Sequence, residues 1–205
     1  MILDASQYLG HNNINMSEID CYALCSAGHK GMYGIQGSGF AIINSDDAID
    51  TLTEGGSGID TFNKEMPYFP PERYEAGTLS TPSIASLLAG VKYIESCGIE
   101  HIHNKINKLT NICEQMLLSL PKVTIYGASA GIISFNIADF PSSYVADFLS
   151  ENNIATRSGF HCAPLIHKKL GTEKQGAVRV SLSHLNTEAE ISILYKSLKD
   201  LLNIK

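Results

Sequence analysis

The chain has 205 residues, of which 44% are hydrophobic and 18% charged, and its formal net charge is -6 at pH 7. This composition is typical of a folded globular protein with one domain or two small ones, and it excludes a disordered chain. The acidic balance and the lack of a dense Lys/Arg run argue against nucleic acid as a partner, and no apolar run approaches the roughly 18 residues of a membrane span.

The first residues show neither the basic region nor the apolar core of a secretion signal, so we expect a cytoplasmic protein. The five cysteines are an odd number. Cys21 and Cys25 lie four positions apart, but no second pair completes a zinc site. We therefore expect free thiols in a reducing compartment and no bound metal.

The N-terminal part of the chain predicts short strands and one long loop. Residues 1–3 are typical of a strand end, and residues 14–19 of a turn or short helix. Short apolar runs predict strands at residues 21–25 and 39–43. Residues 54–82 are rich in Gly and Pro and show little periodicity, which predicts a long loop of the kind that is often functional.

Two helices are predicted next. The first covers residues 83–96 and ends before Gly98. The second runs from about residue 99 to residue 120, where Pro121 stops it. Its apolar residues recur at helical spacing and predict one buried stripe: Ile102, Ile106, Leu109, Ile112, Cys113, Met116 and Leu120.

The remaining residues alternate between strands and helices. The predicted strands cover residues 123–126, 132–137, 154–157 and 177–182, and the predicted helices cover residues 142–151, 163–170 and 187–203. The last helix is amphipathic, and we expect its cap near Asn186 or Thr187, with Glu190 in the capping-box position. Its residues expected to point inward are Ile191, Leu194, Leu198 and Leu201.

The stretch from residue 26 to residue 39 contains Lys30 among small residues and glycines, directly after His29. A lysine in a tight glycine-lined pocket would be desolvated, which favours the free amine over the ammonium form. A free amine is what a lysine needs to form a Schiff base with an aldehyde cofactor such as pyridoxal phosphate. The alternative is a solvated lysine in a glycine-rich loop.

Two further segments carry candidate chemical groups. Cys162 follows His161 and lies five positions after Arg157, and cationic neighbours make a thiol a better nucleophile. Arg179 lies between Val178 and Val180 and interrupts the apolar pattern of a strand, as an arginine that binds a carboxylate or phosphate does. The alternatives are a small core cysteine and an exposed arginine on an edge strand.

These segments together resemble the cysteine desulfurase and selenocysteine lyase group of the class V aminotransferases, which depend on pyridoxal phosphate. The resemblance extends over nearly the whole chain. The motifs that carry it occur in this order: Asp4-Ala5-Ser6-Gln7, Gly28-His29-Lys30, Gly55-Gly56-Ser57-Gly58, Glu75-Ala76-Gly77-Thr78, Arg157-Ser158-Gly159-Phe160-His161-Cys162-Ala163-Pro164, Arg179-Val180-Ser181 and Asn186-Thr187.

The resemblance implies a role for each cofactor-binding residue. Lys30 would bond covalently to pyridoxal phosphate and later move the substrate α-proton, while Asp4 would pair with the protonated pyridine nitrogen. Gln7 would donate a hydrogen bond to the phenolic oxygen. His29 would contact the phosphate, and Ser57 would reach the phosphate held by the partner subunit. Taken in isolation, these residues could equally be a strand-end cap, a surface amide and ordinary loop residues.

The resemblance also implies the substrate-handling residues. Arg179 would bind the substrate carboxylate with both ends of its guanidinium group, and Arg157 would help to hold it or support the cysteine loop. Cys162 would take the substrate sulfur as a persulfide and leave alanine. His167 and His184 match no role, and we expect both on the surface.

The family fold implied is that of a fold type I enzyme. Residues 1–100 would be an incomplete α/β portion of its large cofactor-binding domain, and residues 101–205 its α+β C-terminal domain with a small antiparallel sheet. Members of the family are roughly twice this length. The chain is therefore expected to represent the C-terminal half, with the N-terminal half absent.

The implied reaction is desulfuration of L-cysteine or a related amino acid by a homodimer, with a sulfur-acceptor protein as a further partner. A selenocysteine lyase or another class V aminotransferase is the nearest alternative, although the thiol at residue 162 favours sulfur transfer. We expect weak or no activity from this chain alone. A non-catalytic fragment that self-associates through uncovered strand edges is the alternative outside enzymes.

Overall fold

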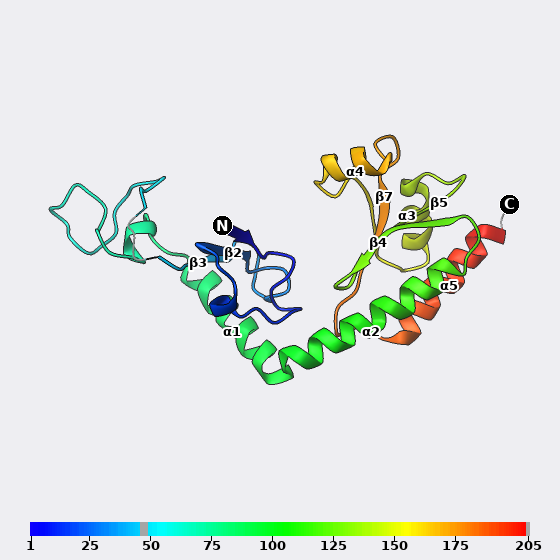
Figure 1. The fold of residues 1–205 in the computed structure, drawn as a ribbon, viewed down its shortest axis with the longest axis horizontal. Coiled ribbons are helices and arrows are strands. Elements are labelled where there is room, and N and C mark those ends of the chain that lie inside the picture. The colour runs from blue at the N-terminus through cyan, green and yellow to red at the C-terminus, as the bar shows by residue number, and fades with distance from the viewer. Residues whose placement is uncertain (46–48, 204–205) are drawn as a thin grey trace. The chain divides into compact units, whose positions relative to one another are not determined.

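The computed structural model describes residues 1–45 and 49–203, and the chain divides into two compact units, Met1–Ile99 and Glu100–Lys205 (Figure 1). Unit 1 contains a mixed sheet and one long helix. Unit 2 contains an antiparallel sheet and a core of buried apolar side chains. Within the described residues, no helix is both long and apolar enough to cross a bilayer.

The sheet of unit 1 has three strands in the order β1-β2-β3. Strand β1 (Ile2–Asp4) runs parallel to β2 (Ala23–Ala27), and β3 (Gly39–Ile43) runs antiparallel to β2. The prediction of a strand over residues 21–25 was two residues early. Pairing with β3 carries β2 as far as Ala27, which lies opposite Gly39.

A 3-10 helix, η1 (Met16–Glu18), lies between β1 and β2, where a turn or short helix was predicted. Between residues 49 and 80, the structure contains one regular element, a second 3-10 helix, η2 (Glu72–Tyr74), which agrees with the predicted long loop at residues 54–82. Figure 1 shows this loop extending away from the sheet. Helix α1 (Thr81–Cys97) follows and ends before Gly98, as predicted.

Two glycines let the backbone after β1 approach the backbone after β2. Gly10 has φ +80°, and a Cβ on it would stand 1.9 Å from the carbonyl oxygen of Gly31. A Cβ on Gly31 would stand 2.3 Å from the carbonyl oxygen of Leu9. No larger residue fits either position without moving the backbone, so these glycines fix the distance between the two segments.

We expect Gly10→Ala to lower the free energy of unfolding by more than about 2 kcal/mol, because it combines backbone strain with a clash. Gly37→Ala is the matched control. Gly37 has φ +84°, but a Cβ there meets nothing within 4 Å, so its cost is expected to be about 1 kcal/mol. Urea denaturation of both variants measures the difference, and equal losses would contradict the close approach.

The sheet of unit 2 has four strands in the order β4-β5-β7-β6, and all neighbours are antiparallel. The strands are β4 (Val123–Ser129), β5 (Ile132–Ile137), β6 (Arg157–Gly159) and β7 (Ala177–Ser181). The helices are α2 (Ile99–Leu118), α3 (Ser142–Glu151), α4 (Pro164–Leu170) and α5 (Glu188–Asn203). The predicted small antiparallel sheet is confirmed.

Strand β6 begins later than predicted. The start of the segment expected to be a strand at residues 154–157 is bonded to the last turn of α3, because the amide of Ile154 donates to the carbonyl of Leu149 (2.8 Å). Pairing with β7 therefore begins only at Arg157.

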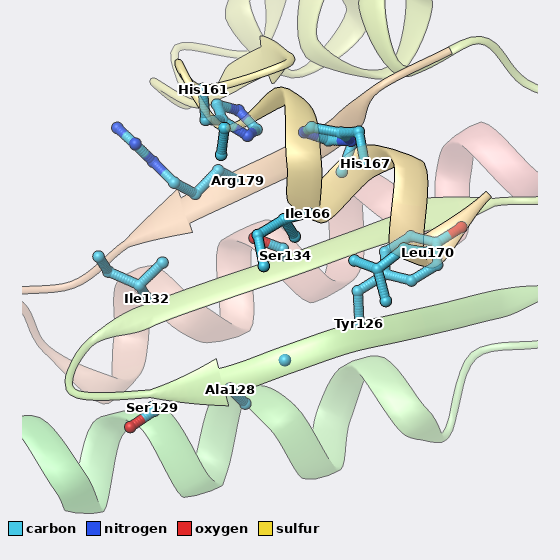
Figure 2. Close-up of a pocket in the computed structure, with 13 residues that line it drawn as sticks. Tyr126, Ala128, Ser129, Ile132, Ser134, His161, Ile166, His167, Leu170 and Arg179 are labelled. Carbon is cyan, nitrogen blue, oxygen red and sulfur yellow. The ribbon is translucent and has the colours of Figure 1, made fainter. Parts of the chain in front are cut away.

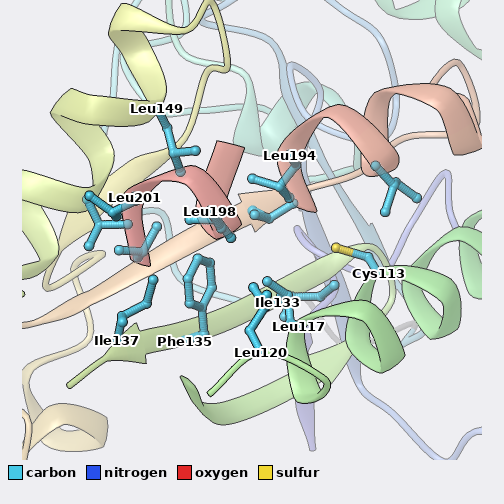
Figure 3. Packing of buried hydrophobic residues seen from close by; sticks show 14 of the residues in the cluster. Cys113, Leu117, Leu120, Ile133, Phe135, Ile137, Leu149, Leu194, Leu198 and Leu201 are labelled. Atoms are coloured by element: carbon cyan, nitrogen blue, oxygen red, sulfur yellow. The ribbon is translucent and has the colours of Figure 1, made fainter. Parts of the chain in front are cut away.

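The core of unit 2 lies between α2, α3, α5 and one face of the sheet (Figure 3). All four inward positions predicted for α5 are buried, whereas on α2 the predicted Ile112 and Met116 are only partly buried. The largest buried side chain is Phe135, which is fully enclosed. The cluster consists of Leu109, Cys113, Leu117, Leu120, Ile133, Phe135, Ile137, Val145, Leu149, Val178, Val180, Ile191, Leu194, Leu198 and Leu201.

The predicted capping box at the start of α5 is confirmed. The amide of Thr187 donates to Glu190 Oε2 (2.7 Å), and the amide of Glu190 donates to Thr187 Oγ1 (3.3 Å). Hydrogen bonds to the Glu190 carboxylate, first from the Thr187 amide and then from the side chains of Thr187 and Asn186, hold the pKa of Glu190 below its usual value.

The expectation that His167 and His184 lie on the surface was wrong, because both are only 5% exposed. His167 belongs to α4, and its Nδ1 lies 2.7 Å from the hydroxyl of Thr172. His184 follows β7. Burial, reinforced by the charges of Lys105 and His101, lowers its pKa.

Candidate functional site

In unit 1, the parallel pairing of β1 with β2 brings the predicted cofactor-binding residues to one edge of the sheet. Asp4 ends β1 and lies opposite Cys25. Gln7 follows β1, while His29 and Lys30 follow β2. Because parallel strands end at the same edge, residues that come just after them lie near one another.

Asp4 is held in its charged form. Its Oδ1 accepts a hydrogen bond from the Ser6 amide (2.9 Å). Hydrogen bonds from Ser6, first from its side chain and then from its backbone, lower the pKa of Asp4, and the positive charge of Lys30 acts in the same direction. A carboxylate of this kind can pair with a cationic ring nitrogen.

Ser6 has a second role that the sequence did not reveal. Its hydroxyl accepts a hydrogen bond from the amide of Ala27 (3.2 Å), and it therefore joins the segment after β1 to the end of β2. The segment after β1 thus supplies a hydroxyl at the backbone of Ala27.

The turn that carries Lys30 is closed by backbone hydrogen bonds. The amide of Tyr33 donates to the Lys30 carbonyl (3.0 Å), and the amide of Gly34 donates to the Gly28 carbonyl (2.7 Å). The side chain of Lys30 is exposed. The expectation of a desolvated lysine is therefore wrong for unit 1 by itself, because the glycines around Lys30 shape its backbone turn without covering its side chain.

Ser57 lies in the long loop, where its hydroxyl accepts a hydrogen bond from the amide of Ile59 (3.4 Å). This loop follows β3 and extends away from the sheet (Figure 1). The topology of unit 1 thus places Asp4, Gln7, His29 and Lys30 after the ends of two parallel neighbouring strands, whereas Ser57 belongs to the loop after β3.

In unit 2, Arg157 of β6 and Arg179 of β7 are direct cross-strand partners. Val178 and Val180 point into the core, so both arginines belong to the opposite face of the sheet. The Nε atom of Arg179 is buried and has no hydrogen-bond partner among the described residues. Two like charges directly opposite each other are destabilising, which makes this pair suited to binding an anion between them.

Cys162 lies in the turn between β6 and α4, and its side chain is exposed. Backbone φ is positive at Gly159 (+104°), His161 (+50°) and Cys162 (+58°). The structure therefore presents the thiol on a strained turn and not in the core, which removes the alternative of a small core cysteine. In the described part of the chain, no three His, Cys, Asp or Glu residues are grouped so as to hold a metal.

His161 links this turn to the arginine pair. Its Nε2 lies 3.1 Å from the Arg157 carbonyl oxygen. Burial lowers the pKa of His161, and the nearby charges of Arg179, His167 and Arg157 add to this, while the hydrogen bond to Arg157 opposes it. The lowered pKa favours the neutral imidazole at the residue that precedes Cys162.

A cavity of about 410 Å³ lies on the same face of the sheet. Figure 2 shows Ile166, His167 and Leu170 of α4 over Ser134 of β5 and Tyr126 of β4. Arg179 and His161 also line it. The cavity is mostly apolar with a guanidinium group at its edge, as expected of a site for a small molecule with a carboxylate.

Sequence reasoning missed two residues of this region, His167 and Thr172. Both are buried and joined by a hydrogen bond (2.7 Å). The one available signal was the position of Thr172 directly after Gly171, the left-handed residue that ends α4. A side chain just past such a cap can turn back toward the last turn of its helix.

Comparison with known proteins identifies the family of the chain. The aminotransferase class V family matches residues 1–194. A probable cysteine desulfurase of Pyrococcus abyssi is 33% identical over 211 residues, which cover 98% of this chain and 51% of that protein. The chain therefore spans about half the length of the curated relatives it matches.

Two solved structures share the fold. The apo cysteine desulfurase of Thermococcus onnurineus NA1 superposes with a TM-score of 0.88 at 29% identity and covers 100% of this chain and 52% of that one. The cysteine desulfurase CsdA of Escherichia coli, in its S-sulfonic acid form, gives a TM-score of 0.91 at 22% identity and covers 99% and 51%. With the family match over most of its length, the chain belongs to the class V aminotransferases, in their cysteine desulfurase group.

Proposed function

We propose that this chain carries the lysine and the sulfur-accepting thiol of a pyridoxal-phosphate-dependent cysteine desulfurase, which converts L-cysteine to L-alanine and leaves the sulfur on Cys162. The observation that carries the proposal is the cross-strand pair of Arg157 and Arg179 beside the turn that presents Cys162. Such a pair can hold an amino acid carboxylate while the thiol meets its side chain.

The residues of unit 1 fit the cofactor. Asp4, whose pKa is lowered, would pair with the protonated pyridine nitrogen, and Lys30 offers an exposed amine at the same sheet edge. Gln7 and His29 would contact the phenolic oxygen and the phosphate. When bound, pyridoxal phosphate supplies an electron sink for the bonds to the substrate α-carbon. Lys30 Nζ would move the α-proton.

Cys162 would perform the sulfur transfer. Its sulfur attacks the substrate sulfur, a sulfur–sulfur bond forms, and the bond between that sulfur and the substrate β-carbon breaks. The electron pair of the broken bond goes to carbon, which takes up a proton and becomes the methyl group of alanine. The products are alanine and a Cys162 persulfide, so no external oxidant or reductant is required.

The glycine loop around Ser57 supports a homodimer within the same proposal. A loop that extends from its own sheet can reach the cofactor phosphate of a second subunit. A sulfur-acceptor protein would then remove the persulfide from Cys162, which is accessible on its turn.

The test incubates the full chain with pyridoxal phosphate and L-cysteine, then measures alanine and maps sulfane sulfur by mass spectrometry. We expect the extra sulfur on Cys162 and its loss in Cys162→Ser. Cys97→Ser is the control, because Cys97 is a half-buried cysteine of unit 1. Equal labelling in both variants would refute the assignment. A parallel reaction with selenocysteine distinguishes a lyase for that substrate.

A further inference from the structure

The turn that carries Cys162 adopts a backbone conformation that its residues disfavour. His161 and Cys162 follow each other with φ +50° and +58°. Residues other than glycine rarely occupy this left-handed region, and they stay there only when the surrounding structure holds them. Something outside the turn must therefore keep it in place.

Among the described residues, the hydrogen bonds of the loop at 160–163 reach only its own residues, the end of β6 and the first turn of α4, where the amides of Ile166 and His167 donate to the Ala163 carbonyl (3.2 and 3.3 Å). The amide of Ala163 donates to the Phe160 carbonyl (2.9 Å), and His161 Nε2 lies 3.1 Å from the Arg157 carbonyl oxygen. These bonds join the turn to its neighbours in the chain, and none of them holds the side chains of Phe160 and His161 against the rest of unit 2.

The ring of His167 makes the connection. The centroid of the Phe160 ring lies 5.4 Å from that of His167 in an edge-on arrangement at 89°, and the His161 ring lies 6.1 Å away. One buried imidazole thus contacts the two residues that precede Cys162. Ring pairs of this kind stabilise their arrangement beyond simple burial.

Thr172 in turn fixes His167. Its hydroxyl lies 2.7 Å from His167 Nδ1, and Thr172 is only 2% exposed. The Thr172 carbonyl accepts from the amide of Gly176 (2.7 Å), and Gly176 packs so closely on Gly159 that a Cβ would stand 2.5 Å from the Gly159 carbonyl oxygen. The segment after α4 therefore reaches both His167 and the start of the turn.

We propose that His167, held by Thr172, is a positioning residue that fixes the left-handed turn and so determines where the Cys162 thiol is presented. The importance of this position for catalysis rests on the proposed function. The claim that His167 fixes the turn is independent of that function, because the exchange of the turn amides can be measured without cofactor or substrate.

The test compares amide hydrogen exchange in the full chain and in Thr172→Val, which keeps the size of the side chain and removes the hydroxyl. We expect exchange in residues 159–163 to become about tenfold faster, since the buried imidazole loses its partner. Exchange in β5 should stay unchanged. Thr110→Val is the matched control.

Thr110 is also buried, and its hydroxyl donates to Ile106 and accepts from the amide of Gly131 (2.8 and 3.1 Å). Thr110→Val should lower the melting temperature without loosening the Cys162 turn. Equal effects of both threonine variants on the turn, or no effect of either, would overturn the proposal.

Two substitutions of His167 distinguish its hydrogen bond to Thr172 from simple filling of space. His167→Asn retains a polar atom near the place of Nδ1, so we expect it to keep more protection of the turn than His167→Leu, which only fills space. In a preparation that transfers sulfur, Thr172→Val should lower kcat several-fold and leave KM for cysteine unchanged. If Thr172→Val loosens the turn but the unchanged chain shows no sulfur transfer, the positioning role of His167 is supported. Only the proposed desulfuration is then contradicted.

Discussion

Replacing Lys30 by alanine is expected to abolish the covalent attachment of pyridoxal phosphate. Lys30 is the lysine at the sheet edge that carries Asp4, and its exposed amine is free to reach an aldehyde. Mixing the protein with the cofactor, reducing the mixture with borohydride and mapping the modified peptide by mass spectrometry locates the attachment. We expect a modified Lys30 in the unchanged chain and only background in the variant.

Lys92→Ala provides the control for this measurement. Lys92 is an exposed lysine of α1 in the same unit, so nonspecific reaction of surface amines would affect both positions alike. Modification spread over several lysines, or unchanged in Lys30→Ala, would show that the edge formed by β1 and β2 is not a cofactor site. The result does not depend on turnover, so an inactive chain can still be tested.

Phe135→Ala is expected to cost about 3–5 kcal/mol of unfolding free energy, the usual loss when a fully buried aromatic ring is removed from a core. Phe135 is 0% exposed and lies opposite Val178, in the central pair of strands of the unit 2 sheet. Leu194 and Leu198 of α5 belong to the same cluster and would be left facing a cavity. Urea denaturation followed by circular dichroism measures the loss.

Leu185→Ala is the comparison for the core variant, because Leu185 is 64% exposed in the same unit. Its effect is expected to stay within about 0.5 kcal/mol. Similar losses in both variants would mean that the core of unit 2 is not organised around Phe135.

Much of unit 2 was predictable because its helices repeat a simple pattern. The stripe from Ile102 to Cys113 and the inward positions of α5 follow the 3.6-residue period, which a sequence displays directly. The capping box of Thr187 and Glu190 involves residues only three positions apart, so it too could be predicted locally.

Other features depend on contacts that local sequence does not show. His167 is buried because Phe160, which precedes α4, and Thr172, which follows it, both pack against its ring. A helix of seven residues has too few positions for its sequence to show which face is buried. Lys30 was expected to be desolvated because glycines surround it in sequence. The structure shows that these glycines serve backbone contacts, such as that of Gly28 with Ser38.

The paired arginines of β6 and β7 have a consequence for the purified protein. Arg157 and Arg179 repel each other across neighbouring strands, and the Nε of Arg179 lacks a partner among the described residues. Dissolved sulfate or phosphate would relieve this repulsion by mass action. The melting temperature of unit 2 should therefore be higher in sulfate or phosphate than in a buffer without such anions.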